Sequence, residues 1–550
     1  MAAAVPRSPT HLRVPVPLPS PWFWGLVVLY VLLGLVGHDP WKADDAIGFG
    51  IAWTMAHGGA ADWLAPNVAG QLVAEEGPLA FWLAALFIKL FGSLLQPHDA
   101  ARLATGVWIS LLVLAVHRAA RCLDGAQASR LAVLGLLASL GLLVRSHEIA
   151  AEPAFLAGWA LMLWALAHGN AARAACLMAA GSAIVLLSRG WASALPVLIV
   201  CLAWPLIAPR DGTMRHAPAM AAGLAIGFFA YLTWWWPMRE ATSFASNYDA
   251  WQLGQLGFPD PLAWRYYGKT ILWFTFPAWP VAVWWIARDR PPKFLDVHPV
   301  PPVQSLPLLA LGVLTASLAW SPRAGESVLL PLLPPLAILI GPAVAHLRRG
   351  QAALIDWFGR MTFTMAAALI WLGYVALITG WPPRIAANLA RLEPGFVSAL
   401  SWPSVVIAAL ATMAWLVAIA RSARTPLRGI VHWCYGTTLV WILLMTLWLP
   451  WIDHGRSYRP VALSLKAALA TRGGSNGACV QAQSLGLAER ASLAYFAAVR
   501  FGDSRDNCLW LLSQGARGDD VRAFPRMRLI WEGNRPGDRN ERFWLYKRIP

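Results

Sequence analysis

Apolar segments of roughly 20 residues recur along most of this 550-residue chain, and that is the length a helix needs to cross a bilayer. Such segments are longer than the strands and most of the helices in the core of a soluble domain. The composition agrees, because 58% of the residues are hydrophobic and only 13% are charged. The sequence therefore predicts a polytopic α-helical membrane protein and excludes an ordinary soluble globular protein.

Thirteen segments are expected to cross the membrane as helices. They cover residues 22–37, 100–117, 129–145, 153–168, 174–188, 190–208, 217–236, 271–287, 304–320, 327–345, 362–380, 403–420 and 430–449. The run 79–91 has only 13 residues, and counting it as a span would move every later basic loop to the other side. We therefore predict that it is a juxtamembrane helix at the outer interface.

Basic residues gather in alternate loops between these segments. The loops contain Arg118, Arg121 and Arg130; Arg173; Arg210, Arg215 and His216; Arg288, Arg290 and Lys293; Arg348, Arg349 and Arg360; and Arg421, Arg424 and Arg428. The positive-inside rule makes their side cytoplasmic. These loops and a basic tail account for the net charge of +16, so that charge does not indicate a nucleic-acid partner.

The composition divides the chain into three parts. Residues 1–21 are Pro-rich and basic and are predicted to be a disordered cytoplasmic leader, and 22–451 form the transmembrane domain, with a first outer loop at 38–99. Residues 452–550 are more polar and are predicted to form a small α/β domain outside the membrane, where thirteen crossings leave the C-terminus. Its strand-like runs lie at 478–482, 508–513, 527–532 and 542–547, with a helical run at 486–499.

The six cysteines fall into two groups. Four lie in or near expected spans and are predicted to be inert: Cys122, Cys176, Cys201 and Cys434. Cys479 and Cys508 stand alone in the outer domain, where an oxidising compartment would permit a disulfide. Their spacing alone leaves that pairing open, because it does not give the distance between them.

Acidic pairs begin and end the core of the first outer loop. Asp44 and Asp45 follow the first apolar helix, and Glu75 and Glu76 precede the run 79–91. A charged acidic side chain at the edge of a membrane costs free energy, and such residues commonly have a functional role. Here they could act as a general base or hold a divalent cation. The alternative is that Asp44 and Asp45 only end a helix and stay hydrated.

The second outer loop carries two more acids. Glu148 and Glu152 are four residues apart, so they share one face if the segment is helical. With Asp44 they form a candidate set of ligands for a divalent metal cation. Glu152 also begins an expected span, and the positive end of that helix is by itself a sufficient reason for an acid there.

Basic residues on the same outer side are candidates for binding phosphate. They are Arg189, Arg265, Lys269 and Arg323. Guanidinium groups bind phosphate through paired hydrogen bonds, and acids facing them suggest a lipid phosphate held beside a base. Each of these residues could instead be an anchor that reaches into the interface.

Short motifs follow one another in a fixed order over residues 22–345. They are DDA at 44–46, WLAP at 63–66, EEGPL at 75–79, AARL at 100–103, SRG at 188–190, SPR at 321–323 and LPLLP at 330–334. Their order and spacing resemble the GT-C superfamily of bacterial membrane glycosyltransferases, in particular the aminoarabinose transferase and protein O-mannosyltransferase-like group. The resemblance implies transfer of a sugar from a polyprenyl-phosphate donor to a lipid, protein or glycan acceptor at the periplasmic face of the inner membrane.

The resemblance also implies roles for individual residues. Asp44 would be the catalytic base, with Asp45 beside it, and Glu152, with Glu148, would be the second acid, linked to a metal. The basic candidates would bind the donor phosphate. Glu76 departs from the family, which has a Lys there that meets the donor phosphate, and Val328 and Gly48 replace tyrosines. Either the donor site differs, or a divalent ion bridges Glu76 to the phosphate, or the chain is not catalytic.

Two other functions compete with sugar transfer. A transporter of lipid-linked sugars would need polar residues at mid-membrane depth and broken helices in paired halves. A catalytically silent relative would bind a lipid-linked sugar or act as a scaffold in the envelope. The acids and arginines at span ends favour the transferase, and the departure at Glu76 favours the silent binder.

Overall fold

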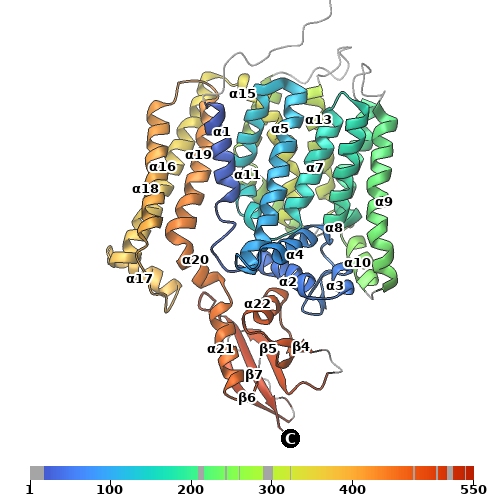
Figure 1. Cartoon of the computed structure of the whole chain (residues 1–550). Coiled ribbons are helices and arrows are strands. Elements are labelled where there is room, and N and C mark those ends of the chain that lie inside the picture. Colours follow the sequence, from blue (N-terminus) through green and yellow to red (C-terminus); the bar gives the residue numbers. More distant parts are fainter. Residues whose placement is uncertain are drawn as a thin grey trace, which may run out of the picture.

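The computed structural model describes residues 18–207, 216–241, 244–258, 261–288, 302–322, 324–474, 477–502, 506–516, 524, 526–538 and 540–549. A bundle of helices stands over a small domain of strands and helices that holds the C-terminus (Figure 1). Of the leader expected at 1–21, only 18–21 are described, and helix α1 (Ser20–Leu32) begins there.

Among the described residues, eight helical segments are long and apolar enough to cross a membrane. They contain α5 (Pro97–Ala138), α8 (Ala171–Ile207), α9 (Ala217–Ala241), α13 (Pro302–Ser317) with η3 (Leu318–Trp320), α14 (Glu326–Leu329) with η4 (Leu330–Leu332) and α15 (Leu333–Ala345), α16 (Arg349–Thr379), α18 (Trp402–Arg421), and α19 (Arg428–Leu443) with η5 (Leu444–Trp448) and α20 (Leu449–Arg456).

Two bent pairs raise this number to ten if each is one span. They are α6 (Leu140–Leu143) and η1 (Arg145–His147) with α7 (Glu152–Ala167), and α11 (Pro261–Phe274) with α12 (Ala278–Arg288). The expected count of thirteen is not confirmed. One reason is that α8 covers nearly all of two expected spans, and α5 covers the span 100–117 together with the first part of the span 129–145. Another is that α1 has only 13 residues.

The breaks inside α5 and α8 occur at glycines with positive φ. Gly125 has φ 83° and Gly190 has φ 78°, a conformation that residues with a Cβ rarely adopt. At Gly190 an added Cβ would also collide with Tyr248 and Gln252 of α10 (Phe244–Leu253). The chain therefore needs glycine there for both backbone and space, and the break fixes the position of Arg189.

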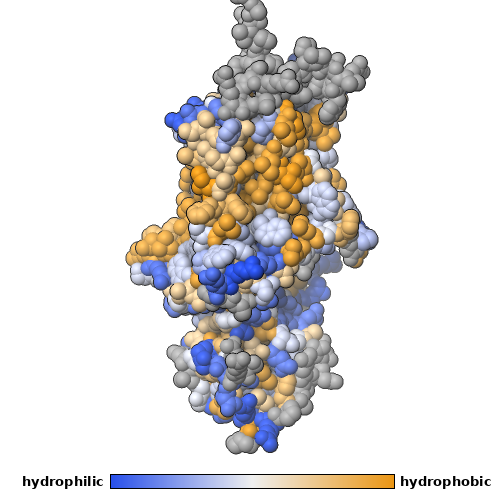
Figure 2. Space-filling model, turned by 90° about the vertical axis from the view of Figure 1, so that its right-hand side faces the viewer, coloured by the Kyte–Doolittle hydropathy of each residue, from blue (hydrophilic) through white to orange (hydrophobic). Residues whose placement is uncertain are grey.

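Apolar side chains cover the outside of the bundle. On the face drawn in Figure 2, hydrophobic residues form a band across the helical part, and hydrophilic residues lie below it. Leu354, Met365 and Leu369 of α16 and Leu410 of α18 are among the exposed apolar side chains. A surface of this kind is one that lipid would cover.

The first outer loop folds into short elements at the end of the bundle that faces the small domain (Figure 1). They are α2 (Asp44–His57), α3 (Ala60–Leu64), β1 (Asn67–Val68), β2 (Gln71–Leu72) and α4 (Leu79–Phe91). The strands β1 and β2 pair antiparallel. Helix α4 occupies the run 79–91, and at 13 residues it is too short to cross a bilayer. Helix α17 (Pro383–Leu392) lies at the same end.

The C-terminal domain is an α/β unit with a mixed sheet in the order β4-β3-β5-β7-β6. Strand β3 is parallel to β4 and β5, and β7 is antiparallel to β5 and β6. The elements are α21 (Arg459–Ala470), β3 (Cys479–Gln483), α22 (Leu487–Phe496), β4 (Arg500–Gly502), β5 (Trp510–Ala516), β6 (Met527–Gly533) and β7 (Glu541–Arg548). Four strands and α22 lie where strands and a helix were expected; β4 was not expected.

Ion pairs and hydrogen bonds fasten this domain to the first outer loop. Lys42 Nζ lies 3.1 Å from Glu541 Oε1 and 3.2 Å from Glu489 Oε1. Arg459 pairs with Asp39, and the guanidinium of Arg490 donates to the carbonyls of Val68 and Ala69. The domain therefore supports the loop that carries the candidate acids.

Candidate functional site

Asp45 is a buried anchor of the first outer loop. Its carboxylate accepts from Arg102 Nη2 at 2.8 Å, from the backbone N–H of Ile149 at 2.9 Å and from that of Trp41 at 3.1 Å. Burial would raise the pKa of Asp45, but the Arg102 guanidinium outweighs it and holds the pKa below its ordinary value. With 1% of its side chain exposed, Asp45 joins α2, α5 and the second outer loop.

Asp44, one residue earlier, points toward a different partner. Half of its side chain is exposed, and its carboxylate pairs with Arg145. Arg145 also lies 3.1 Å from Glu148 Oε2 and 3.8 Å from Glu326 Oε2. The structure thus brings Asp44 and Glu148 together around a single guanidinium. Burial raises the pKa of Glu148 to about 8, so Asp44 is the exposed acid of the cluster that carries charge at neutral pH.

Glu152 and Arg189 form the second part of the site. Glu152 is in the first turn of α7, and Arg189 immediately precedes the break at Gly190; the two side chains pair. Gln252 spans the break, since its Oε1 accepts from the N–H of Ala192 at 3.0 Å and its Nε2 donates to the carbonyl of Arg189 at 3.2 Å. These bonds satisfy helix ends that the break exposes, and they hold Arg189 in place.

Glu76 approaches the same pair from the first outer loop. Its Oε1 lies 3.9 Å from Arg189 Nη1, and the N–H of Gly77 donates to the carbonyl of Ser188 at 2.8 Å, which ties the loop to α8. Burial raises the pKa of Glu76 to about 8, and nearby Glu152 adds to the effect. Its Oε2 is buried without a hydrogen-bond partner in the described part of the chain. At neutral pH Glu76 is therefore mostly an uncharged carboxyl that can donate.

A cavity of about 140 Å³ begins at the Glu152–Arg189 pair. Gln255, Ser321 and Ser327 add polar groups to its lining. The other walls are mostly apolar and come from α7, α8, α13 and η4: Phe155, Leu156, Leu195, Pro196, Ile199, Val313, Leu314, Leu330 and Pro331. One charged end and long apolar walls suit a ligand with an anionic head and a hydrocarbon chain.

Of the four basic residues predicted to bind phosphate, only Arg189 is placed in the Glu152–Arg189 pair. Arg265 and Lys269 are exposed on α11, one helical turn apart, and neither lines the cavity. Arg323 lies outside the described residues, although Ser321 and Ser327 on either side line the cavity. Glu75 is exposed beside Glu76.

The proposed metal ligands do not gather. Among the residues that the structure describes, Asp44, Glu148 and Glu152 form no group in which a single ion could reach all three, and arginines already pair with them. A divalent cation therefore does not fit these residues as placed.

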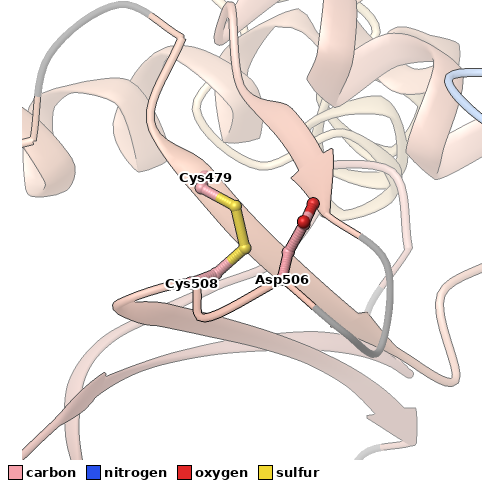
Figure 3. A group of neighbouring side chains, drawn as sticks. All are labelled: Cys479, Asp506 and Cys508. Atoms are coloured by element: carbon pink, nitrogen blue, oxygen red, sulfur yellow. A yellow bond between two sulfur atoms is a disulfide. The ribbon is translucent and has the colours of Figure 1, made fainter.

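In the described part of the chain, the group with spacing that suits a metal ion is in the C-terminal domain. Figure 3 shows Cys479 and Cys508 joined by a disulfide, with Asp506 beside them. Their Cα atoms are 5.1 Å apart. Sulfur atoms in a disulfide are not thiolate ligands, so this group is a covalent link between β3 and the segment before β5.

Two arginines were not among the candidates. Arg145 precedes Glu148 by three residues, so the spacing of charges within the loop could have predicted the ion pair between them. Arg102 pairs with an acid 57 residues away, and no local pattern shows that.

No protein-family model matches the sequence, and neither does any curated protein. The fold is similar to ArnT from Cupriavidus metallidurans in the apo state, with a TM-score of 0.66 and 15% identity over 95% of this chain and 97% of that one. ArnT bound to undecaprenyl phosphate gives a TM-score of 0.66 at 16% identity, with the same coverage.

The archaeal oligosaccharyltransferase AglB from Archaeoglobus fulgidus matches more weakly, with a TM-score of 0.39 and 11% identity over 90% of this chain and 69% of that one. With ArnT, by contrast, nearly the whole of both chains aligns. The chain therefore has the fold of ArnT along nearly its whole length.

Proposed function

We propose that the protein transfers a sugar from a polyprenyl-phosphate donor to an envelope acceptor at the periplasmic face of the bacterial inner membrane. The observation that carries this is the Glu152–Arg189 pair at the charged end of a cavity with apolar walls. ArnT, which has the same fold, is known in a form bound to undecaprenyl phosphate, and that supports a donor of this class.

Arg189 and Glu76 are the proposed contacts of the donor phosphate. Arg189 would exchange Glu152 for phosphate oxygens, which guanidinium binds through paired hydrogen bonds. Glu76, uncharged at neutral pH, would donate through its unpartnered Oε2. A neutral donor in place of the family's lysine removes the charge conflict between an acid and a phosphate. Arg323 remains a further candidate, and Arg265 and Lys269 would attract the anionic donor from outside the cavity.

Asp44 is the proposed general base, because it is the exposed acid of the first pair. It would take the proton of an acceptor hydroxyl or amine while the acceptor atom bonds to the sugar's anomeric carbon. The bond from that carbon to the phosphate oxygen breaks on the opposite face, and polyprenyl phosphate leaves. Asp45 is assigned a positioning role, since Arg102 and two backbone N–H groups hold its carboxylate.

The first test compares cell envelopes carrying wild-type protein, Asp44→Asn, Glu240→Gln or no protein. Glu240 is an exposed acid at the end of α9 and serves as the matched control. We expect Asp44→Asn cells, like the deletion, to accumulate a polyprenyl-phosphate sugar and to lose one glycosylated product, as measured by mass spectrometry. Glu240→Gln should match wild type. The accumulated and missing molecules then identify the donor and the acceptor.

A silent binder is the second candidate, and the departure at Glu76 favours it, because an acid stands where the family has a lysine that meets the donor phosphate. The same test separates the two functions. If Asp44→Asn cells match wild type while the deletion differs, binding or scaffolding replaces catalysis.

A further inference from the structure

A second cavity, of about 720 Å³, lies at the other end of α7. It is lined by Arg118 and Arg121 of α5, by Trp164 and His168 at the end of α7, and by Arg173 near the start of α8. The 16 residues of α7 rise about 1.5 Å each, so roughly 24 Å separates this cavity from the candidate site. It is therefore a distinct feature on the side predicted to be cytoplasmic.

The charges of this cavity are not balanced by acids. Within the described ranges, Arg118, Arg121 and Arg173 form no ion pair with a carboxylate, whereas Arg145 and Arg189 at the candidate site each do. Arg118 lies over the ring of Trp164, 6.0 Å from its centroid, and that contact orients it. Three guanidinium groups around one space repel each other and attract an anion.

Two further features at the cavity favour an anion. The N-terminus of α8 lies at its edge, where Asn170 Oδ1 accepts from the N–H of Arg173 at 3.0 Å. His168 Nδ1 accepts from the N–H of Asn170 at 3.0 Å, so a neutral ring carries its proton on Nε2 and can donate. The positive end of the helix adds to the attraction for an anion.

We propose that this cavity binds the phosphate group of an anionic membrane phospholipid. Arginines suit phosphate oxygens, and Trp164 and Leu177 offer apolar surface to the adjoining part of the lipid. Basic pockets between helices on the cytoplasmic side are suited to such headgroups. A soluble phosphate compound shares this chemistry, and the experiment separates the two sources.

Two thiols in the wall of this cavity allow the binding of a ligand there to be measured. Cys122 and Cys176 line the cavity and are exposed, whereas Cys201 and Cys434 are buried and the other two cysteines are joined. The neutral reagent N-ethylmaleimide should therefore label two thiols in folded protein. An unfolded variant would label four, so a folding defect is recognised in the same experiment.

The test measures the rate at which N-ethylmaleimide labels the full chain in three preparations. The first is nanodiscs of phosphatidylcholine alone, the second is the same nanodiscs with cardiolipin added to the lipid, and the third is the first preparation with inorganic phosphate added to the buffer. We expect cardiolipin to slow labelling roughly threefold, as two-thirds occupancy requires. Protection by inorganic phosphate without protection by cardiolipin would overturn the lipid assignment in favour of a soluble phosphate compound. Equal rates in all three preparations would overturn the phosphate site.

Matched triple variants assign the protection to the cavity. The first replaces its arginines and should lose protection by cardiolipin: Arg118→Gln, Arg121→Gln and Arg173→Gln. The control variant replaces three exposed arginines at the same end of the bundle and should keep the protection by cardiolipin. Its substitutions are Arg349→Gln, Arg421→Gln and Arg424→Gln. Equal protection in both variants would show a general surface effect and would overturn the proposal.

Discussion

At the scale of single residues, Glu76 is the informative departure from the motif pattern, because it puts a carboxyl where a cation is expected beside the donor phosphate. Its surroundings resolve the conflict. The side chain is largely buried near Glu152, and its pKa is raised to about 8. Below that pH the neutral carboxyl dominates and can donate, while above it a carboxylate would repel the phosphate.

Affinity for undecaprenyl phosphate should therefore fall when the pH rises from 7 to 9. A group with a pKa near 8 keeps only about a tenth of its neutral form at pH 9, so we expect roughly a tenfold loss. Glu76→Gln, which stays neutral, should bind with little change over this range. The measurement is Kd by titration of detergent-solubilised protein. Glu75→Gln changes an exposed neighbour and should keep the wild-type dependence of Kd on pH. If Glu76→Gln also shows the wild-type dependence of Kd on pH, Glu76 does not have this role.

The residue pattern alone could select the acids, but only the family resemblance distinguished Asp44 from Asp45. Neighbouring residues in a helix differ by about 100° in direction, so one can be buried while the other is exposed. Which one is buried depends on Arg102, whose position relative to α2 is set by packing. Glu152 and Arg189 were both candidates, but their pairing follows from the break at Gly190, which apolar periodicity does not show.

At the scale of elements, one buried acid fastens α16 to α19. Asp356 of α16 lies 2.5 Å from Arg428 Nη2 and 2.6 Å from His432 Nδ1, both of α19, and 3.0 Å from Arg360 Nη2 within its own helix. Ser422 adds a hydrogen bond to His432 Nε2 at 2.9 Å. Apolar patterns predicted both helices, but the acid that joins them falls inside an expected polar loop.

Asp356→Asn should destabilise the bundle strongly, because it removes the buried carboxylate that pairs with the partly buried Arg428. Breaking a buried pair costs about 3 kcal/mol or more. We expect a clear drop in the thermal unfolding midpoint of the detergent-solubilised protein. Arg360→Gln is the comparison, since its side chain is 32% exposed and its loss should cost about 1 kcal/mol or less. Equal midpoints for Asp356→Asn and wild type would contradict this account.

At the scale of the whole molecule, the fold follows from physical constraints that many sequences satisfy. ArnT shares it at 15% identity, because apolar length, span order and charged loops suffice to specify the membrane layer. The same constraints made the fold class predictable, and strand-like runs predicted four strands of the C-terminal domain. They do not specify how the C-terminal domain docks, since Lys42 reaches Glu489 and Glu541 across more than four hundred residues of chain.

That docking predicts a long-range effect on the candidate site. Replacing Lys42 with Met removes the cation that Glu489 and Glu541 share and leaves Glu541 paired only with Arg535 of its own domain, so the contact between the domain and the first outer loop should loosen. Hydrogen exchange of residues 38–78 should become faster, and donor affinity should fall because this loop carries Asp44 and Glu76. Arg472→Met, an exposed basic residue of the same domain, is the control and should change neither. If exchange quickens while affinity stays constant, the domain stabilises the loop without positioning the donor site.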